Sequence, residues 1–304
     1  MHLRRVHRNP LDMRKHILDK PRLYQWTLYL ARNLPQPVLY GLARLVGGLV
    51  YLCSSKDRTT MRHNLRLALD GTASQANLAV ILWRVFQNYA VYMVDFFRLL
   101  DMNLVESRDR TQLYEGRRHL DEALAQGRGV ILLTAHLGNW EIGGLGLRAL
   151  GYPVTVVTLR HNSAFTNHLV NTMRGRHSIR VVELGDSAYD GIEIIRALQH
   201  QEVVAVLGDR VFADRAGSTT LFGRTVPLPL GPILMAMATG APIVPAFSVM
   251  EAPGCYRGII EPALDILRGP DREAALQHNL RQVAGIFERV IRRFPDQWYQ
   301  IDRL

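Results

Sequence analysis

Short apolar runs alternate, from residue 115 onward, with stretches in which apolar residues recur every three or four positions. Such runs are typical of buried strands, and the longer period is typical of helices that pack one face on a core. The runs predict strands over 129–134, 153–158, 179–183, 203–207, 243–249 and 256–261. The periodic stretches predict helices over 117–126, 139–149, 163–175, 188–200, 230–239 and 271–294. This alternation predicts an α/β fold: a mostly parallel sheet flanked by helices on both faces.

The first third of the chain has the helical period only. It predicts helices over 21–34, 38–52, 58–69 and 73–100, while residues 208–229, rich in Gly and Arg, are predicted to form a long polar loop. We therefore expect a basic tail over 1–22, a helical region over 23–110 and a core over 111–304. The helical region is expected to pack on the core, so that the two make a single domain.

The N-terminal region has features of a segment that associates with a membrane. Residues 1–22 carry seven Arg or Lys against two Asp, and the apolar stretch 23–52 is broken by charges and prolines. No apolar run reaches the ~20 residues that span a bilayer. A basic flank beside broken apolar helices favours a segment lying in an anionic membrane surface. A helical cap packed on the core is the alternative, and both remain open.

The composition of the chain limits the kinds of partner that it is expected to bind. The chain has 304 residues and a net charge of +10, and its 37 basic residues include only three lysines, Lys15, Lys20 and Lys56. A basic balance fits an anionic membrane surface, a phosphorylated substrate or nucleic acid. The chain lacks an aromatic-interleaved basic patch and any known nucleic-acid motif, so nucleic acid is not an expected partner. Two cysteines, Cys53 and Cys255, make neither a disulfide framework nor a metal site.

The first candidate catalytic residues follow the end of the predicted strand 129–134. His136 lies between this strand and the helix that opens near Asn139, which is where α/β folds place their sites. Glu141 follows five residues later, and inside one helix the two side chains would lie roughly 140° apart. They can meet only if His136 lies in the loop and Glu141 in the first helical turn. The Glu141 carboxylate would then accept a hydrogen bond from the imidazole, leaving the other ring nitrogen as a base.

The start of this helix is also a candidate anion site. Its first turn should leave backbone amides free near Gly138 and Asn139, and these could bind an oxyanion or a phosphate. Glu141 could equally be an ordinary acidic residue paired with the helix dipole.

Further polar residues follow other predicted strands. Asp209 and Arg210 follow 203–207, while Arg160 and Asn162 follow 153–158, so parallel strands would bring all four to the edge that holds His136. Arg174 ends the next helix and could also hold a phosphate. The His and Glu spacing matches no zinc signature, so no metal is expected.

Taken together, five ordered blocks resemble the lipid A biosynthesis acyltransferases (lauroyl/myristoyl type) of the lysophospholipid acyltransferase superfamily. The resemblance covers roughly residues 20–304. Thr134 to Glu141, TAHLGNWE, is similar to the family's His-x4-Glu/Asp block. Arg160, Asn162 and Arg174 are similar to the second block, Gly208-Asp209-Arg210 to the third and Pro242 to Phe247 to the fourth. The ending from Phe294 to Tyr299, FPDQWY, matches the family's P-x-Q-W signature.

The resemblance implies an O-acyltransferase that moves a fatty acyl chain from a thioester to a hydroxyl of a membrane lipid. The implied donor is acyl carrier protein or acyl-CoA, with no other cofactor, and a lipid A precursor is the first acceptor considered. By analogy His136 is the general base, Glu141 orients it, and Asp209 with Arg210 orders the site or binds the acceptor. The implied location is the cytoplasmic face of the inner membrane, bound peripherally or monotopically.

Three alternatives remain open at this point. Related branches acylate other glycolipids, such as mannosylated phosphatidylinositol, or lysophospholipids. The same dyad could serve an acyl thioesterase, in which water replaces the acceptor hydroxyl. A basic membrane-binding protein without chemistry would keep its function when His136 is removed.

Overall fold

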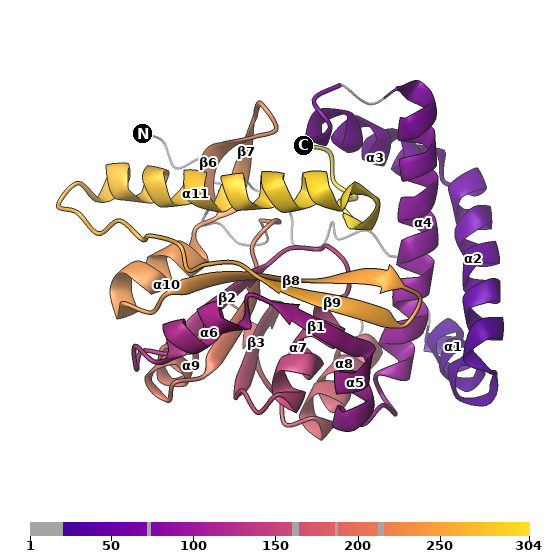
Figure 1. The fold of residues 1–304 in the computed structure, drawn as a ribbon, viewed down its shortest axis with the longest axis horizontal. Coiled ribbons are helices and arrows are strands. Elements are labelled where there is room, and N and C mark those ends of the chain that lie inside the picture. Colours follow the sequence, from indigo (N-terminus) through magenta and orange to yellow (C-terminus); the bar gives the residue numbers. More distant parts are fainter. Residues whose placement is uncertain (1–20, 72–73, 160–163, 186–187, 212–215) are drawn as a thin grey trace.

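A seven-stranded sheet forms the centre of the structure, a computed structural model that describes residues 21–71, 74–159, 164–185, 188–211 and 216–304 (Figure 1). The strands lie in the order β1-β9-β8-β2-β5-β3-β4. Their bounds are β1 Thr111–Glu115, β2 Val130–Thr134, β3 Val154–Leu159, β4 Arg180–Leu184, β5 Val203–Leu207, β8 Ile243–Ala252 and β9 Cys255–Ile260.

Five neighbouring strands, from β8 through β2, β5 and β3 to β4, run parallel to one another. The two remaining strands run the other way, because β9 pairs with β8 through a tight antiparallel hairpin and β1 lies parallel to β9. The predicted α/β class with a mostly parallel sheet is therefore confirmed. The carboxyl ends of β2 and β5, which are direct neighbours, open at the same edge of the sheet.

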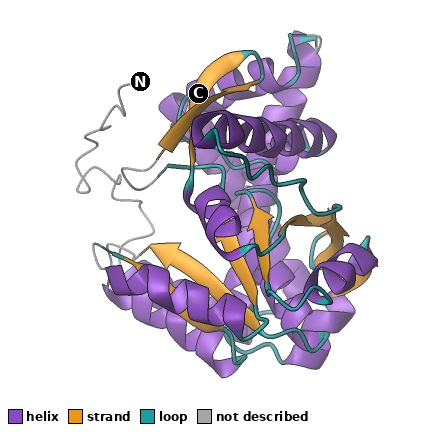
Figure 2. Cartoon of the chain, turned by 90° about the vertical axis from the view of Figure 1, so that its left-hand side faces the viewer, coloured by secondary structure: helices purple, strands orange, loops and turns teal. Residues whose placement is uncertain are grey.

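Alternate residues of β2 face opposite halves of the core, as the two-residue period of a strand requires. Val130 and Leu132 pack with side chains of α6 (Arg117–Leu124), α7 (Trp140–Ala149) and α8 (Ala164–Arg176). Ile131 and Leu133 pack with side chains of α9 (Ala188–Gln199), α10 (Gly231–Thr239) and α11 (Arg272–Arg293). Helices thus cover both faces of the twisted sheet, as Figure 2 shows.

The helices α1 (Pro21–Asn33), α2 (Gln36–Cys53), α3 (Ser55–Ala68), α4 (Gln75–Arg98) and α5 (Leu104–Arg110) precede the sheet. In Figure 1 the long α4 stands beside the sheet and α2 runs along the outer side of α4. Buried residues of α4, such as Leu82, Val91 and Phe97, join the core on the α7 side of the sheet. The predicted tail over 1–22 lies outside the described residues except for its last two positions.

Two features differ from the sequence prediction. The predicted loop 208–229 contains a hairpin, β6 (Ala216–Leu221) and β7 (Arg224–Pro229), which pair with each other. Buried and exposed positions alternate along β6, and positive φ angles at Phe222 (51°) and Gly223 (71°) form its two-residue turn. The short elements α5 and β1 were also not predicted, because few residues in them show a clear period.

Candidate active site

His136 and Asp209 are brought together by two neighbouring parallel strands. Thr134 at the end of β2 lies opposite Leu207 at the end of β5, and the Gly208 amide donates to the Thr134 carbonyl, 2.9 Å away. The two chains therefore leave the sheet side by side. A Cβ at Gly208 would lie 2.5 Å from Cδ1 of Leu133, so a larger residue there would force the Leu133 side chain to move.

Asp209 holds His136 through two hydrogen bonds, one to the imidazole and one from the backbone amide. Nδ1 of His136 lies 2.7 Å from Oδ1 of Asp209, and the His136 backbone amide donates to Oδ2 at 3.0 Å. An ionised carboxylate can only accept, so Nδ1 carries the hydrogen and Nε2 has the lone pair. The side chains are 13% and 6% exposed, which places the pair just below the surface.

Asp209 is held in its ionised form. Burial favours the neutral acid and would raise the pKa of Asp209, but the charge and hydrogen bonds of His136 and the charge of Arg210 outweigh burial and lower it below its ordinary value. A lowered pKa in the folded state stabilises the fold above the ordinary Asp pKa, and this contribution is lost as the pH falls through the lowered value. Asp209 therefore remains a negative partner for His136 at neutral pH.

Glu141 does not occupy the position that the sequence predicts. Both of its oxygens bind the guanidinium of Arg174, with Nη2 to Oε1 at 2.6 Å and Nε to Oε2 at 3.2 Å. The side chains are 9% and 6% exposed, so this is a buried bidentate ion pair. The predicted contact between Glu141 and the imidazole is wrong, because α7 turns the Glu141 side chain toward α8 while β5 supplies Asp209 to Nδ1.

The turn from His136 to Asn139 is clamped on two sides. The Asn139 amide donates to the Ser248 carbonyl of β8 at 2.8 Å, and the Gly138 amide donates to the Gln297 carbonyl at 2.9 Å. Gly138 has a φ of 65°, and a Cβ there would lie 1.9 Å from the Ser248 oxygen. The expectation of free amides at Gly138 and Asn139 is wrong, since both hydrogens are already engaged.

The C-terminal signature acts as a brace for this turn. The Tyr299 amide donates to the His136 carbonyl at 2.9 Å, so residues 297–299 run antiparallel to the turn. The Gln297 side chain bonds to both the amide and the carbonyl of Met250, each at 2.7 Å. Arg210, a predicted binding residue, donates to the Tyr299 carbonyl and, at 2.9 Å, to the Gln300 side chain. The guanidinium of Arg210 thus ties the β5 loop to the chain terminus.

Two predicted residues, Arg160 and Asn162, lie outside the described residues. Within the described ranges, no group of three His, Cys, Asp or Glu side chains could hold a metal ion.

An apolar cavity lies beside the His136 turn, between α7 and the sheet. It starts near Thr134 and Leu207, at the strand ends that precede His136 and Asp209. Its other lining residues include Leu132, Val156, Ala205, Gly143, Gly144 and Ala246. Trp140 lines the cavity and meets the His136 ring edge-on, with 5.1 Å between ring centres. The arrangement thus places a His–Asp pair next to a mostly apolar cavity, whose lining also includes Glu141 and Arg174.

Comparison with known proteins decides the family. The model of the family described as "Bacterial lipid A biosynthesis acyltransferase" matches residues 13–304. The chain belongs to this family. The resemblance seen in the sequence is thereby confirmed, and the chain is an acyltransferase that acts on lipid or glycolipid acceptors.

Two kinds of relative are similar to the chain. A phosphatidylinositol mannoside acyltransferase of Mycobacterium tuberculosis (strain CDC 1551 / Oshkosh) is 28% identical over 217 residues, which cover 71% of this chain and 67% of the relative. A lipid A biosynthesis palmitoleoyltransferase of Escherichia coli (strain K12) is 26% identical over 289 residues, which cover 91% and 87%. Both names describe acyl transfer, one with phosphatidylinositol mannoside and the other in lipid A biosynthesis.

Sequence reasoning placed Asp209 at the correct edge but missed its role as the partner of His136. The available signal was that two apolar runs, 129–134 and 203–207, are each followed two residues later by a titratable side chain, His136 in one case and Asp209 in the other. Strand order would have been needed to make them neighbours, and spacing along the chain does not give that order. Ser248 and Tyr256 also form hydrogen bonds with this turn. Nothing in the sequence around these two strand residues indicates that contact.

The Glu141–Arg174 pair is expected to be structural. Glu141→Gln leaves the Arg174 guanidinium buried without a counter-charge, which costs about 3 kcal/mol of unfolding free energy. The double variant Glu141→Gln/Arg174→Gln should lose less than the sum of the two single losses, as measured by urea unfolding. Asp70→Asn, which removes an exposed partner of Arg292 (57% and 39% exposed), should cost under about 1 kcal/mol. Additive losses at Glu141 and Arg174 would contradict this role.

Proposed function

We propose that this protein transfers a fatty acyl chain from acyl carrier protein or acyl-CoA to a hydroxyl of a membrane glycolipid by general-base catalysis at His136. The observation that carries the proposal is the contact between Nδ1 of His136 and Asp209 at 2.7 Å, beside an apolar cavity. A carboxylate on Nδ1 fixes the tautomer in which Nε2 is the base, and stabilises the imidazolium once it forms. Asp209 takes the orienting role that the sequence suggested for Glu141.

The reaction then follows from the positions of these groups. Nε2 of His136 removes the hydroxyl proton of the acceptor as its oxygen attacks the thioester carbonyl carbon. The tetrahedral oxyanion forms near the N-terminus of α7, whose dipole favours negative charge. When the C–S bond breaks, the leaving thiolate takes the proton back from the imidazolium. Both steps are proton transfers at one nitrogen, so no covalent enzyme intermediate is required.

The apolar cavity is the proposed site of the acyl chain. Its lining comes mainly from apolar side chains of the sheet and from glycines of α7, and a mostly apolar surface binds methylene groups. The Glu141–Arg174 ion pair is also among the lining residues. The cavity begins at the strand ends that carry His136 and Asp209, so a chain bound there would present its thioester to the pair. A lipid A precursor is the first acceptor to test, with a phosphatidylinositol mannoside beside it.

Membrane binding is proposed for the outer face of α2, on the cytoplasmic side of the inner membrane. Among the described helices, α2 alone is long and apolar enough to cross a bilayer, and only 22% of it is buried. One side packs on the protein through Leu39, Tyr40 and Ala43. The opposite side exposes apolar residues at three- and four-residue steps: Val38, Leu42, Leu45, Leu49 and Leu52. Because one side is held by α4, we infer that α2 lies in the plane of the membrane surface.

The first test of the proposed function addresses general-base catalysis by His136. With labelled acyl donors and a panel of lipid acceptors in micelles, His136→Ala should lower transfer by about 10² or more, because it removes the base. Asp209→Asn should lower kcat by a similar factor, since an amide on Nδ1 no longer fixes the tautomer. Asp70→Asn, an exposed carboxylate bonded to Arg292, serves as the control and should keep full activity. If His136→Ala kept its acyl-transfer activity, the proposal would be refuted. If the rate of acyl release stayed the same whichever lipid acceptor was added, a thioesterase would be favoured.

The second prediction tests the acyl site. Gly144 lines the cavity, and a Cβ built on it has no atom within 4 Å. Gly144→Leu should therefore fill the cavity without disturbing the fold and shift the preferred donor toward shorter acyl chains, as measured by kcat/KM across a donor series. Gly191→Leu places the same side chain at an equally open helical glycine of α9 and should leave the preference unchanged. If Gly144→Leu left the preferred acyl-chain length unchanged, this cavity would not be the site that binds the acyl chain.

The third prediction tests the membrane face. Leu45→Glu/Leu49→Glu adds two charges to the exposed side of α2, where these residues are 62% and 54% exposed. Flotation with anionic phospholipid vesicles should fall by about tenfold or more, since each charge opposes insertion. Ile192→Glu/Ile195→Glu makes the same change on exposed positions of α9 (43% and 37%) and should keep binding. Equal binding by both variants would show that α2 does not face the lipid.

A further inference from the structure

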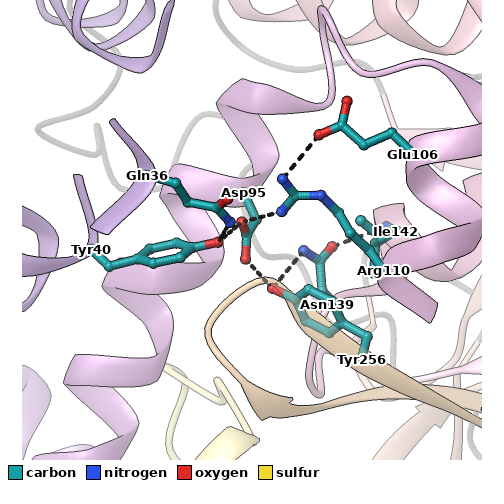
Figure 3. A network of polar contacts seen from close by, with 8 residues as sticks. All are labelled: Gln36, Tyr40, Asp95, Glu106, Arg110, Asn139, Ile142 and Tyr256. Carbon is teal, nitrogen blue, oxygen red and sulfur yellow. Dashed lines mark hydrogen bonds and ion pairs between the residues drawn. The ribbon is translucent and has the colours of Figure 1, made fainter. Parts of the chain in front are cut away.

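A buried carboxylate, Asp95 of α4, lies at the centre of a polar network that Figure 3 shows from close by. Its side chain is fully buried, and hydroxyls approach it from two different elements. Tyr40 of α2 bonds to Oδ1 at 2.6 Å, and Tyr256 of β9 bonds to Oδ2. Arg110 of α5, 10% exposed, lies 3.5 Å from Oδ1 and also pairs with Glu106 at 3.0 Å.

The direction of the hydrogen bonds in this network is fixed. The Ile142 amide is a donor, so the oxygen of the Asn139 side chain must face it, at 3.1 Å. The NH₂ group of Asn139 then faces Tyr256 and donates to its hydroxyl at 3.3 Å. The hydroxyl oxygen accepts this bond, so its own proton points to Asp95. Asp95 therefore ends a chain of donors that starts at Asn139, the residue that caps α7.

The same logic holds on the other side of Asp95. Gln36 lies 2.6 Å from the Tyr40 hydroxyl, which in turn donates to Asp95. Each carboxylate oxygen thus has a hydroxyl donor, and the Arg110 guanidinium faces Oδ1, which is the environment of an ionised group. Burial is the largest effect and leaves the pKa of Asp95 above its ordinary value, although the bonds from Tyr256 and Tyr40 and the charge of Arg110 oppose this rise.

Asn139 connects the network to the reacting group. It stands three residues after His136, in the turn whose amides bond to Ser248 and Gln297. If the Asn139 side chain turned over, its NH₂ group would face the Ile142 amide and the cap of α7 would be lost. As long as Asp95 accepts the Tyr256 proton, Asn139 keeps one orientation.

We propose that Asp95 is a positioning residue for His136, which acts through Tyr256 and Asn139 to hold the catalytic turn at the start of α7. The proposal rests on the general-base role of His136 given above. The contact between Asp95 of α4 and Tyr256 of β9 then has a specific part in catalysis. The proposal also gives Tyr256 and Tyr40 different roles. Tyr256 lies on the path to His136, whereas Tyr40 ties the membrane-facing helix α2 to the same carboxylate without touching the turn.

The test compares hydroxyl deletions on the two sides of Asp95. Tyr256→Phe should lower kcat by about tenfold with KM unchanged, because a small displacement of the base slows the reaction without weakening binding. Tyr40→Phe removes an equivalent hydrogen bond from Asp95 and should lower the melting temperature while leaving kcat in place. Asp95→Ala should lower kcat as Tyr256→Phe does, because it removes the acceptor of the Tyr256 proton.

A second readout does not depend on acyl transfer. In protein labelled with ¹⁵N-histidine, the Nδ1–H resonance of His136, assigned by its loss in His136→Ala, should shift in Tyr256→Phe and Asp95→Ala. It should stay in place in Tyr40→Phe and in Tyr152→Phe, a tyrosine that bonds to Asp121 and Arg117 away from the site. These shifts are expected even if no lipid acceptor is found, so failure of the proposed function would be seen separately.

Two outcomes would overturn the proposal. In the first, Tyr256→Phe and Tyr40→Phe lower the melting temperature, kcat and the His136 resonance in parallel, which would make Asp95 a stabilising group only. In the second, Tyr256→Phe leaves both kcat and the resonance unchanged.

Discussion

The contact between His136 and Asp209 depends on one constraint: β2 and β5 are parallel, adjacent and in register up to Thr134 and Leu207. Because the strands end together, the two loops leave the sheet side by side, and a short acidic side chain is enough to reach the imidazole. A shift of register by one residue would turn these side chains to the opposite face. The fully buried apolar residues of both strands, packed on two faces, oppose such a shift.

The backbone of the turn that contains His136 is held by hydrogen bonds on both sides. Its backbone is bonded to β8 on one side and to residues 297–299 on the other, so segments more than 100 residues apart in sequence meet at one four-residue loop. Polar groups buried this deeply stabilise a single arrangement, because any alternative leaves a donor or acceptor unpaired. The Glu141–Arg174 pair belongs to this scaffold, since it joins the first turn of α7 to the end of α8.

The same scaffold connects the catalytic edge of the sheet to the surface that we assign to the membrane. Helix α4 contributes apolar residues to the core, packs against α2 on its outer side and brings Asp95 to β9. A lipid acceptor bound at the proposed membrane surface would therefore lie beside a wall formed by α4 and the side chains packed on it. The rings of Tyr92 and Trp140, 4.8 Å apart, extend this wall to the His136 ring. In this view the apolar cavity receives the acyl chain from one side while the acceptor approaches from the lipid.

The sequence by itself determined most of the elements, the α/β class and the family, because apolar periodicity and the ordered blocks from TAHLGNWE to FPDQWY are local signals. It also placed His136 and Asp209 at strand ends. It did not reveal the hairpin within 208–229, where turn and alternation are short, or the charged Asp95 within an apolar helix as the centre of a network. Only the tertiary structure decided that Asp209 and not Glu141 reaches Nδ1, that Arg174 neutralises Glu141, and that Arg210 binds the C-terminal residues. These pairings depend on the order of strands in the sheet and on the direction in which each helix leaves it, and neither is encoded in the spacing of residues along the chain.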